Sequence, residues 1–596
     1  MRTVARILLP VVALAVAASA AVGQGLPQKK LIEYGWDVPY PDYIRQNIRE
    51  MERRPFDGLI FRLRDYNHAF DTRPWPEADL QPQLEDLAAI EWGKFTDNFL
   101  MLYAANQWGM DWFNDDQWAV IEANARLSSR AARAARCVGL CFDPEPYGEN
   151  PWAFVAKEGG PSFAETYAQV RKRGAQFVRA LQGGYPGMKL LTLFEFTFLG
   201  HGLTDPSFER RMEVLRNDGY GLYPAFINGM IEAAAPDVVL IDGNESAYYY
   251  TAVESYFRAY HLMRQQALGL VAPELWDRFH GHQRAGMAVY FDQLMDTRTP
   301  PEQFLAHYLS PEDRLRWMEH NVYWALYTCD EYTWYYSEKM NWWTGEFPDG
   351  LDTALQSARD KITRGQPLGF SVDAMLREAE RQRAEAVQAR IERRSTTVRP
   401  LPAGAAKPVP DGDLSDPVWG DVPPLEPFLL NASHGDDRQP GAATIARVAH
   451  DDEALYLAVE CSEPRIEAIR IGGGGRDSDL WYGDTVELFL SRTAQPTPYA
   501  HFILNPANVQ WDAESAEGGP DSAGWNAEWQ SGTRIGDTAW TAELVIPWTA
   551  LGGKPEPGET RRANVCRARI PDRELSAWST VVDGFVEPMC FGEWAF

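Results

Sequence analysis

Short apolar runs alternate with longer amphipathic stretches along the first 395 residues of the chain. The amphipathic stretches, such as Phe163–Leu181 and Arg314–Leu326, repeat apolar residues at helical spacing. Eight shorter runs have the apolar character of buried strands: Leu31–Trp36, Phe56–Leu63, Phe99–Tyr103, Val138–Phe142, Lys189–Phe194, Val238–Ile241, Met287–Phe291 and Tyr332–Tyr336. Strands that alternate with helices in this way predict an α/β fold, a (β/α)8 TIM-like barrel over residues 27–395.

The pattern changes after residue 395. Residues 396–410 are rich in proline and alanine and lack periodicity, which is typical of a linker. From 411 to 596, apolar and polar residues alternate in short runs such as Thr485–Leu490 and Thr541–Ile546, separated by Gly, Asp and Pro turns. This alternation predicts an all-β sandwich, so the chain is multidomain, with a barrel followed by a sandwich.

The first 23 residues have the pattern of a cleaved signal peptide. Arg2 and Arg6 precede an apolar run, Ile7–Val22, and the small-residue cleavage pattern is Ala18-Ser19-Ala20 or Ala21-Val22-Gly23. No later apolar stretch is long enough to cross a bilayer. We therefore expect a secreted or periplasmic protein without membrane insertion.

Charge limits the partners. The chain has 84 acidic and 57 basic residues, a net charge of −27, which repels nucleic acid and anionic membranes and favours neutral ligands. Histidines are few, and His201, His261, His280 and His282 show no metal-ligand spacing with nearby acids, so we expect no catalytic metal and no cofactor. The oligomeric state stays open.

Six cysteines are too few for a disulfide scaffold in a chain of 596 residues. Export would permit disulfides, and Cys566 and Cys590 are the more plausible partners.

Polar residues follow nearly every predicted strand of the barrel. In such barrels, chemistry takes place at the carboxyl ends of the strands. Buried carboxylates cost several kcal/mol unless they are paired or used, so this pattern predicts a pocket for a hydroxyl-rich ligand. The substrate-binding candidates at these positions are Asp37, Arg62, Asn106, Glu195 and Asp292.

The fourth predicted strand ends in Asp143-Pro144-Glu145-Pro146-Tyr147. Residues i and i+2 of a strand point the same way, so Asp143 and Glu145 should both face the mouth of the barrel. Two close carboxylates cannot both ionise cheaply, so one pKa should rise. A carboxyl with a raised pKa can protonate a glycosidic oxygen.

This segment resembles the fourth-strand motif of family 18 chitinases and related barrel glycosidases. The resemblance implies that Glu145 is the proton donor. It is partial, because Cys141 stands where that family has another aspartate.

A second carboxylate would act as nucleophile or base. Glu245 is the first candidate, Glu338 the second and Glu195 the third. The alternative for Glu145 is a structural ion pair with an arginine such as Arg62.

Aromatic residues cluster around the last predicted strand. About half should pack between helices, and Trp342 and Trp343 are the candidates for a sugar-binding platform.

The C-terminal region resembles the family 9 carbohydrate-binding modules. The resemblance rests on five segments in family order: Asp411–Trp419, Ala449–Leu457, Leu480–Phe489, Trp540–Trp548 and Phe591–Trp594. It implies that a terminal sugar is held between tryptophans, with Trp481 at one stacking position and Trp578 or Trp525 as candidates for the other. It also permits structural calcium in the sandwich. The alternative is that Trp481 shields the core edge beside Asp484 and Glu487.

Together these features predict a secreted glycoside hydrolase, acting on a polysaccharide or oligosaccharide, with an appended carbohydrate-binding module. Two alternatives stay open. One is a non-catalytic glycan-binding protein, and the other is an envelope structural protein whose sandwich mediates protein contacts.

Overall fold

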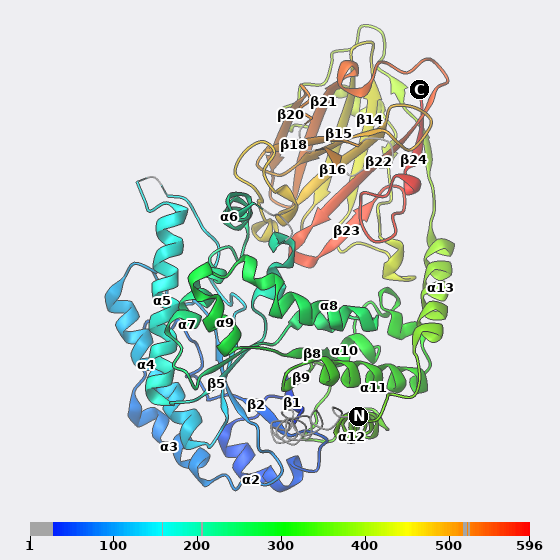
Figure 1. Cartoon of the computed structure of the whole chain (residues 1–596). Coiled ribbons are helices and arrows are strands. Elements are labelled where there is room, and N and C mark those ends of the chain that lie inside the picture. Colours follow the sequence, from blue (N-terminus) through cyan, green and yellow to red (C-terminus); the bar gives the residue numbers. More distant parts are fainter. Residues whose placement is uncertain (1–27, 158, 204–206, 516–520, 523–524) are drawn as a thin grey trace, which may run out of the picture. The chain divides into compact units, whose positions relative to one another are not determined.

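The computed structural model describes residues 28–157, 159–203, 207–515, 521–522 and 525–596 (Figure 1). The chain forms two compact units. The first runs to Arg298 and continues over Leu309–Arg377, and the second contains Thr299–Tyr308 and Glu378–Phe596. The predicted signal peptide lies outside the described residues.

The first unit is built on a nine-stranded parallel sheet. Its strands are β1 (Lys30–Gly35), β2 (Gly58–Phe61), β3 (Phe99–Tyr103), β4 (Gly139–Asp143), β5 (Lys189–Thr192), β6 (Val239–Asp242), β7 (Gln283–Ala285), β8 (Met287–Tyr290) and β9 (Tyr332–Ser337). The order is β7-β6-β5-β4-β3-β2-β1-β9-β8. The edge strands β7 and β8 are consecutive in the chain and separated only by Gly286, so the sheet closes through that segment. The predicted TIM-like barrel is confirmed, with its seventh strand split in two.

Helices surround this sheet (Figure 1). They are α2 (Pro41–Met51), α3 (Glu77–Ala89), α4 (Asp115–Ala134), α5 (Phe163–Gly184), α6 (Phe208–Asn217), α7 (Tyr223–Ala233), α8 (Val253–Arg264), α9 (Trp276–His282), α10 (Phe291–Leu294), α11 (Pro311–Thr328) and α12 (Leu351–Thr363). Local sequence sets where they begin. Ser162 and Glu165 form a reciprocal capping box at the start of α5, and the Asn114 side chain caps α4. No helix among the described residues is both long and apolar enough to cross a membrane.

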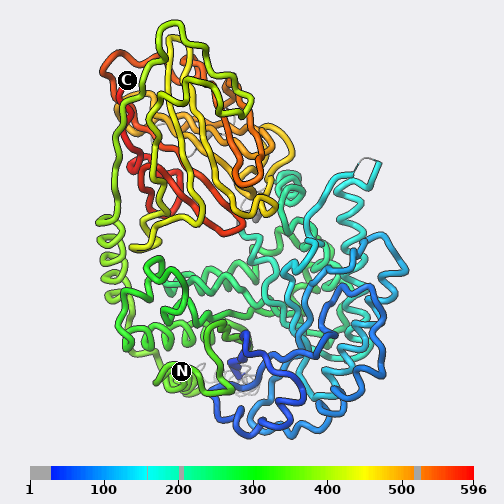
Figure 2. Tube along the Cα trace, turned by 180° about the vertical axis from the view of Figure 1, so that it is seen from behind, coloured from blue at the N-terminus to red at the C-terminus, as the bar shows by residue number. Residues whose placement is uncertain are grey.

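The second unit contains α13 (Asp373–Arg390) from Glu378 onward and is otherwise mostly β-sheet (Figure 2). One sheet has the order β10-β24-β22-β16-β17-β18-β19, with β13 and β23 attached through β22, and the other has the order β11-β14-β15-β21-β20, with β12 on β14. The strands are β10 (Ser395–Thr397), β11 (Arg399–Pro400), β12 (Pro424–Leu425), β13 (Leu429–Leu430), β14 (Thr444–His450), β15 (Ala454–Ser462), β16 (Thr485–Ser491), β17 (Tyr499–Leu504), β18 (Gln510–Ser515), β19 (Asp521–Ser522), β20 (Gln530–Ile535), β21 (Ala539–Pro547), β22 (Thr560–Arg569), β23 (Glu574–Ala577) and β24 (Gly592–Ala595). Apolar side chains of both sheets, such as Leu457 and Leu488, form a common buried core. The predicted sandwich is confirmed.

The segment expected to be a linker belongs in part to the sandwich. Within residues 396–410, β10 pairs with β24 and β11 pairs with β14. The compact unit also starts earlier than the predicted boundary, at Glu378. The proline and alanine content of this segment does not predict strands. β11 ends in a proline, and it can still form because it lies at a sheet edge and pairs on one side only.

The predicted pairing of Cys566 with Cys590 does not occur. All six cysteines are buried and free. Burial raises the pKa of the Cys590 thiol to about 11 and that of Cys566 well above its usual range, which keeps both sulfurs protonated inside the same apolar cluster.

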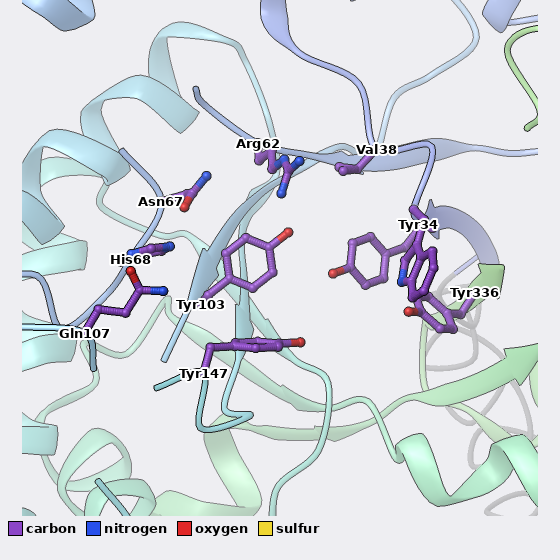
Figure 3. A pocket seen from close by; sticks show the side chains of 11 residues that line it. Tyr34, Val38, Arg62, Asn67, His68, Tyr103, Gln107, Tyr147 and Tyr336 are labelled. Atoms are coloured by element: carbon purple, nitrogen blue, oxygen red, sulfur yellow. The ribbon is translucent and has the colours of Figure 1, made fainter. Parts of the chain in front are cut away.

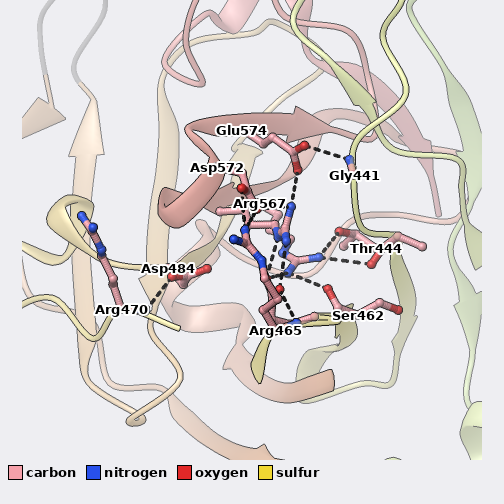
Figure 4. A network of polar contacts seen from close by, with 12 residues as sticks. Gly441, Thr444, Ser462, Arg465, Arg470, Asp484, Arg567, Asp572 and Glu574 are labelled. Atoms are coloured by element: carbon pink, nitrogen blue, oxygen red, sulfur yellow. Dashed lines mark hydrogen bonds and ion pairs between the residues drawn. The ribbon is translucent and has the colours of Figure 1, made fainter. Parts of the chain in front are cut away.

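Buried charges join the two sheets of the sandwich (Figure 4). Arg567 on β22 donates to the Ser462 carbonyl at 2.8 Å and to the Thr444 hydroxyl at 3.3 Å, at the ends of β15 and β14. Next to it, the Arg569 guanidinium lies 2.6 Å from the buried Glu463 carboxylate. These buried polar contacts stabilise the sandwich only while all partners are present, because loss of one partner would leave an unpaired buried charge.

Substitution of Gly139 should destabilise the barrel. A Cβ at this first residue of β4 would lie 1.7 Å from the Lys189 carbonyl oxygen on β5. We expect Gly139→Ala to lower the free energy of unfolding by at least about 2 kcal/mol in chemical denaturation. The control is Gly183→Ala in α5, where a Cβ meets nothing within 4 Å. That variant should be neutral or up to about 1 kcal/mol more stable, and similar losses in both variants would contradict the close approach.

Candidate active site

Two carboxyls and a phenol meet at the end of β4. Asp143 is buried and Glu145 is half-buried. Asp143 Oδ1 accepts the Glu145 backbone N–H at 2.9 Å, so a turn at Pro144, and not strand alternation, brings the two residues together. The Tyr147 hydroxyl oxygen lies 3.0 Å from Asp143 Oδ2 and 2.5 Å from Glu145 Oε2. A phenol has one proton to donate. Tyr147 can therefore hydrogen-bond to both carboxyls at once only when one of them is protonated and donates to the phenol oxygen.

Asp143 is the more deeply buried of the two carboxyls. Burial, and then the negative charge of Glu145, raise its pKa to about 8. Hydrogen bonds from the Glu145 N–H and Tyr147 lower this pKa but do not outweigh burial.

Glu245 joins this pair from β6. Asn244, in a left-handed conformation with φ 48°, turns the chain at the end of the strand, and Glu245 begins a short 3-10 helix, η2 (Glu245–Tyr249). Burial, followed by repulsion from Glu145 and Asp143, raises the pKa of Glu245 to about 8. The structure therefore brings together three of the four predicted catalytic carboxyls.

The fourth, Glu338, lies beside two other phenols. Its backbone N–H donates to Asp292 Oδ2 at 2.7 Å, and its charge raises the pKa of Tyr290 and of Tyr336. The repulsion that acts on Glu245 comes from Glu145 and Asp143. Glu338 is thus the weaker candidate for the second catalytic carboxylate.

A second buried acidic pair lies below these residues. Glu195 is fully buried and accepts the Thr192 hydroxyl at 2.9 Å and the Gln283 amide at 2.5 Å. Burial and the charge of Asp242 raise its pKa to about 8, and burial raises the pKa of Asp242 to about 6. Because Glu195 has no exposed surface, it supports the site from within and does not itself line the pocket.

A cavity of about 530 Å³ opens beside Tyr147 (Figure 3). Its walls come from the ends of β1, β2, β3, β4 and β9: Tyr34, Gly35, Trp36, Val38, Arg62, Asn67, His68, Tyr103, Gln107, Tyr147 and Tyr336. Trp36 is 65 % exposed, so its flat ring is open to a ligand. Phenols, amides and one guanidinium provide hydrogen-bonding groups around it. Tyr147 connects this cavity to the carboxyls.

Sequence reasoning missed Trp36 and His68 as wall residues. Trp36 directly follows β1, at the same end of the barrel as Glu145. Its position at a carboxyl strand end is the signal that could have identified it.

The remaining predicted barrel residues have different roles. Arg62 lines the cavity. Asn106 is buried and accepts the Met110 N–H at 2.8 Å, Asp37 accepts the Trp342 N–H at 2.8 Å, and Asp292 is buried beneath Glu338. These contacts hold loops around the mouth.

Trp342 and Trp343 do not form the predicted sugar platform. Both are buried, and the Trp342 ring packs at 5.0 Å from Phe56 and 4.4 Å from Phe347. The two rings pack against other aromatic side chains. The sequence alone could not distinguish such buried tryptophans from exposed ones.

In the sandwich, Trp481 is 46 % exposed and stands edge-on to Trp511 at 6.1 Å. Trp578 is 3 % exposed and belongs to the core, so it cannot present a face to a sugar, and Trp525 packs partly buried against that core. Asp484 accepts the Arg470 N–H at 2.9 Å and thereby helps to position the turn that carries Trp481.

Metal coordination finds no support in the described ranges. They contain no group of three or more His, Cys, Asp or Glu side chains arranged to hold an ion.

Residues 410–565 match the family described as Carbohydrate family 9 binding domain-like. This match confirms the predicted module. No curated protein matches the chain.

Similar solved structures include a family 9 carbohydrate-binding module from Caldicellulosiruptor kristjanssonii in complex with glucose, at 18 % identity over 34 % of this chain and 95 % of that one, with a TM-score of 0.25. A glycoside hydrolase family 5 enzyme from Prevotella bryantii B14 is 10 % identical over 56 % of this chain and 96 % of that one, with a TM-score of 0.32. A GH30 endoxylanase from Clostridium papyrosolvens C71 is 10 % identical over 88 % of this chain and 98 % of that one, with a TM-score of 0.23.

The buried carboxyls should make stability depend on pH. Asp143, Glu195 and Glu245 have pKa values of about 8 in the folded protein, against about 4 in an unfolded chain. Between these values the folded state binds more protons than the unfolded state, so each group stabilises the fold at low pH and loses that contribution as pH rises through about 8. We expect the melting temperature to fall from about pH 5 to about pH 9, and to fall less steeply in Glu195→Gln, which cannot ionise.

The matched control is Glu254→Gln at an exposed position of α8, which should keep the wild-type slope. Equal slopes in all three proteins, measured by circular dichroism, would contradict the buried protonated state of Glu195.

Proposed function

We propose that the protein is an exported glycoside hydrolase that acts on a polysaccharide or oligosaccharide, with the sandwich as its carbohydrate-binding module. The observation that carries this proposal is the hydrogen bond to Glu145 from Tyr147, which lies in the wall of a cavity lined by phenols and Trp36, together with the effect of the Glu145 charge on Glu245. Hydrolysis of a glycosidic bond needs two carboxyl groups beside the scissile bond, one that gives a proton and one that acts as base or nucleophile.

The electrostatics suggest how the roles divide. Glu245, with a pKa of about 8, keeps its proton at neutral pH and can protonate the departing glycosidic oxygen. Glu145, which accepts the Tyr147 hydroxyl, is then the base or nucleophile. This division reverses the expectation that Glu145 is the donor. The C–O bond breaks, the leaving oxygen takes the Glu245 proton, and water supplies the hydroxyl of the new sugar end and returns a proton to the carboxyl pair.

The second unit supports the same substrate class. Its match to a carbohydrate-binding family and the exposed ring of Trp481 favour sugar stacking over a role in shielding the core. Such a module raises the effective substrate concentration at the barrel. Export rests on the apolar pattern of residues 7–22.

Loss of either carboxyl should stop hydrolysis. We expect Glu145→Gln and Glu245→Gln to lower kcat by about 10²–10⁴-fold on natural glycans. Glu245→Gln should retain more activity on dinitrophenyl glycosides, whose leaving group needs no proton, whereas Glu145→Gln should not. The assay is product release from a panel of plant, algal and microbial polysaccharides.

The matched control is Glu338→Gln, which should stay within a few-fold of wild type. If the wild type cleaves no glycan but binds one, the protein is a glycan-binding protein instead.

We expect the sandwich to contribute to binding of insoluble polysaccharide and not to the rate of hydrolysis. Trp481→Ala should weaken retention on insoluble polysaccharide by about tenfold, while turnover of soluble oligosaccharides stays unchanged. Trp276→Ala removes an exposed tryptophan from the barrel unit and serves as the control for non-specific effects. Unchanged retention after loss of Trp481 would show that this ring is structural.

A further inference from the structure

The charge of Arg62 is not neutralised by a carboxylate. Arg62 directly follows β2 and is half-buried. Its guanidinium donates to the Tyr40 hydroxyl at 3.0 Å, and its surroundings are the phenols of Tyr40 and Tyr103. Within the part of the chain that the structure describes, it forms no ion pair, and its Nε is buried without a hydrogen-bond partner.

The neighbouring arginines are paired. Arg64 lies 3.0 Å from Asp42, and Arg73 lies 3.0 Å from Asp71. Asp42 and Asp71 therefore face these other cations, and Asp65 lies in the wall of a second cavity and forms no ion pair with Arg62 among the described residues. A half-buried guanidinium without a counter-charge loses hydration, and the Tyr40 hydroxyl replaces only part of it.

Arg62 lies on a wall shared by two cavities. The cavity beside Tyr147 measures about 530 Å³, and a second one of about 440 Å³ lies next to it. Arg62, Asn67 and His68 line both. Figure 3 shows these side chains and Tyr103 gathered on one side of the first cavity. His68 Nδ1 is also buried without a partner. Two polar atoms of this wall, Arg62 Nε and His68 Nδ1, therefore have no hydrogen-bond partner among the described residues.

We infer that Arg62 receives an anionic substituent of the sugar chain, a carboxylate or a sulfate ester, so that the substrate class is an acidic glycan. This inference rests on the proposed function and names the substrate of the same site. A guanidinium offers a planar fork of donors that matches such a group in a bidentate way. The net charge of −27 repels polyanions in general, so the cavity is a local exception to the charge of the whole chain.

The test removes one charge at a time, either from the ligand or from the protein, and compares the affinities. The ligands are oligomers of polygalacturonate, alginate and glucuronoxylan, each also in carboxyl-reduced form, together with sulfated carrageenan and fucoidan oligomers. Binding is measured by calorimetry with the full chain in the inactive Glu145→Gln background. Arg62→Gln removes the unpaired charge. Arg45→Gln removes an exposed charge already paired with Asp86 and is the matched control.

We expect Arg62→Gln to weaken binding of the best acidic oligomer by about 10- to 100-fold, and that of its carboxyl-reduced form less than about twofold. Arg45→Gln should change neither. Arg62→Lys, which keeps the charge but loses the fork, should recover part of the affinity, which a merely structural role would not predict. Equal thermal unfolding of the variants excludes misfolding.

The outcomes separate the sources of the charge. Arg62-dependent binding of uronates alone assigns a carboxylate, and of carrageenan or fucoidan alone a sulfate ester. Equal loss for acidic and reduced ligands, or binding of no acidic oligomer, overturns the inference. If acidic oligomers bind through Arg62 but the wild type hydrolyses none, the proposed hydrolase activity fails and the ligand class stands. If the wild type hydrolyses neutral glycans but binds no acidic oligomer, the hydrolase activity stands and the ligand class fails.

Discussion

Closure of the barrel through Gln283–Tyr290 is the constraint on which the site depends. One half of this segment pairs with β6 and the other with β9, and the Gly286 N–H donates to the Asp242 carbonyl at 2.7 Å between them. A Cβ at Gly286 would lie 2.9 Å from that carbonyl oxygen, so only glycine passes without displacement. A closed parallel sheet sends every carboxyl strand end to the same mouth. Residues far apart in sequence, such as Glu145 and Glu245, therefore meet there.

The same closure supports the site from below. Gln283, the first residue of β7, donates to the buried Glu195, whose neighbour Asp242 ends β6. Two acidic groups in that interior cannot both be charged cheaply, and the pKa of each is raised, mainly by burial. The arrangement is repeated at the mouth, where Asp143 and Glu245 flank Glu145. Burial is the larger cause in each case, and the like charge adds to it.

The effects of charged and aromatic residues depend on where each side chain lies and not on their totals in the chain. The net charge of −27 describes the surface as a whole, whereas the wall shared by the two cavities contains the unpaired Arg62. Tryptophans divide in the same way. Trp342 and Trp578 fill cores, while Trp36 and Trp481 expose their rings. Counts of residue types therefore indicate a carbohydrate-active protein less clearly than the positions of a few side chains do.

The sequence by itself determined the two folds, because periodicity of apolar residues reports directly which faces are buried. It also predicted that Asp143, Glu145 and Glu245 lie at the mouth, since residues that end barrel strands lie at that end of the barrel. It did not distinguish the buried Trp342 from the exposed Trp36, or reveal that β10 and β11 join the sandwich. Those outcomes depend on which surfaces pack against one another. Only the tertiary structure decided which carboxyls are buried and that Arg62 faces phenols and not a carboxylate, because burial and pair distances arise from contacts between segments far apart in the sequence.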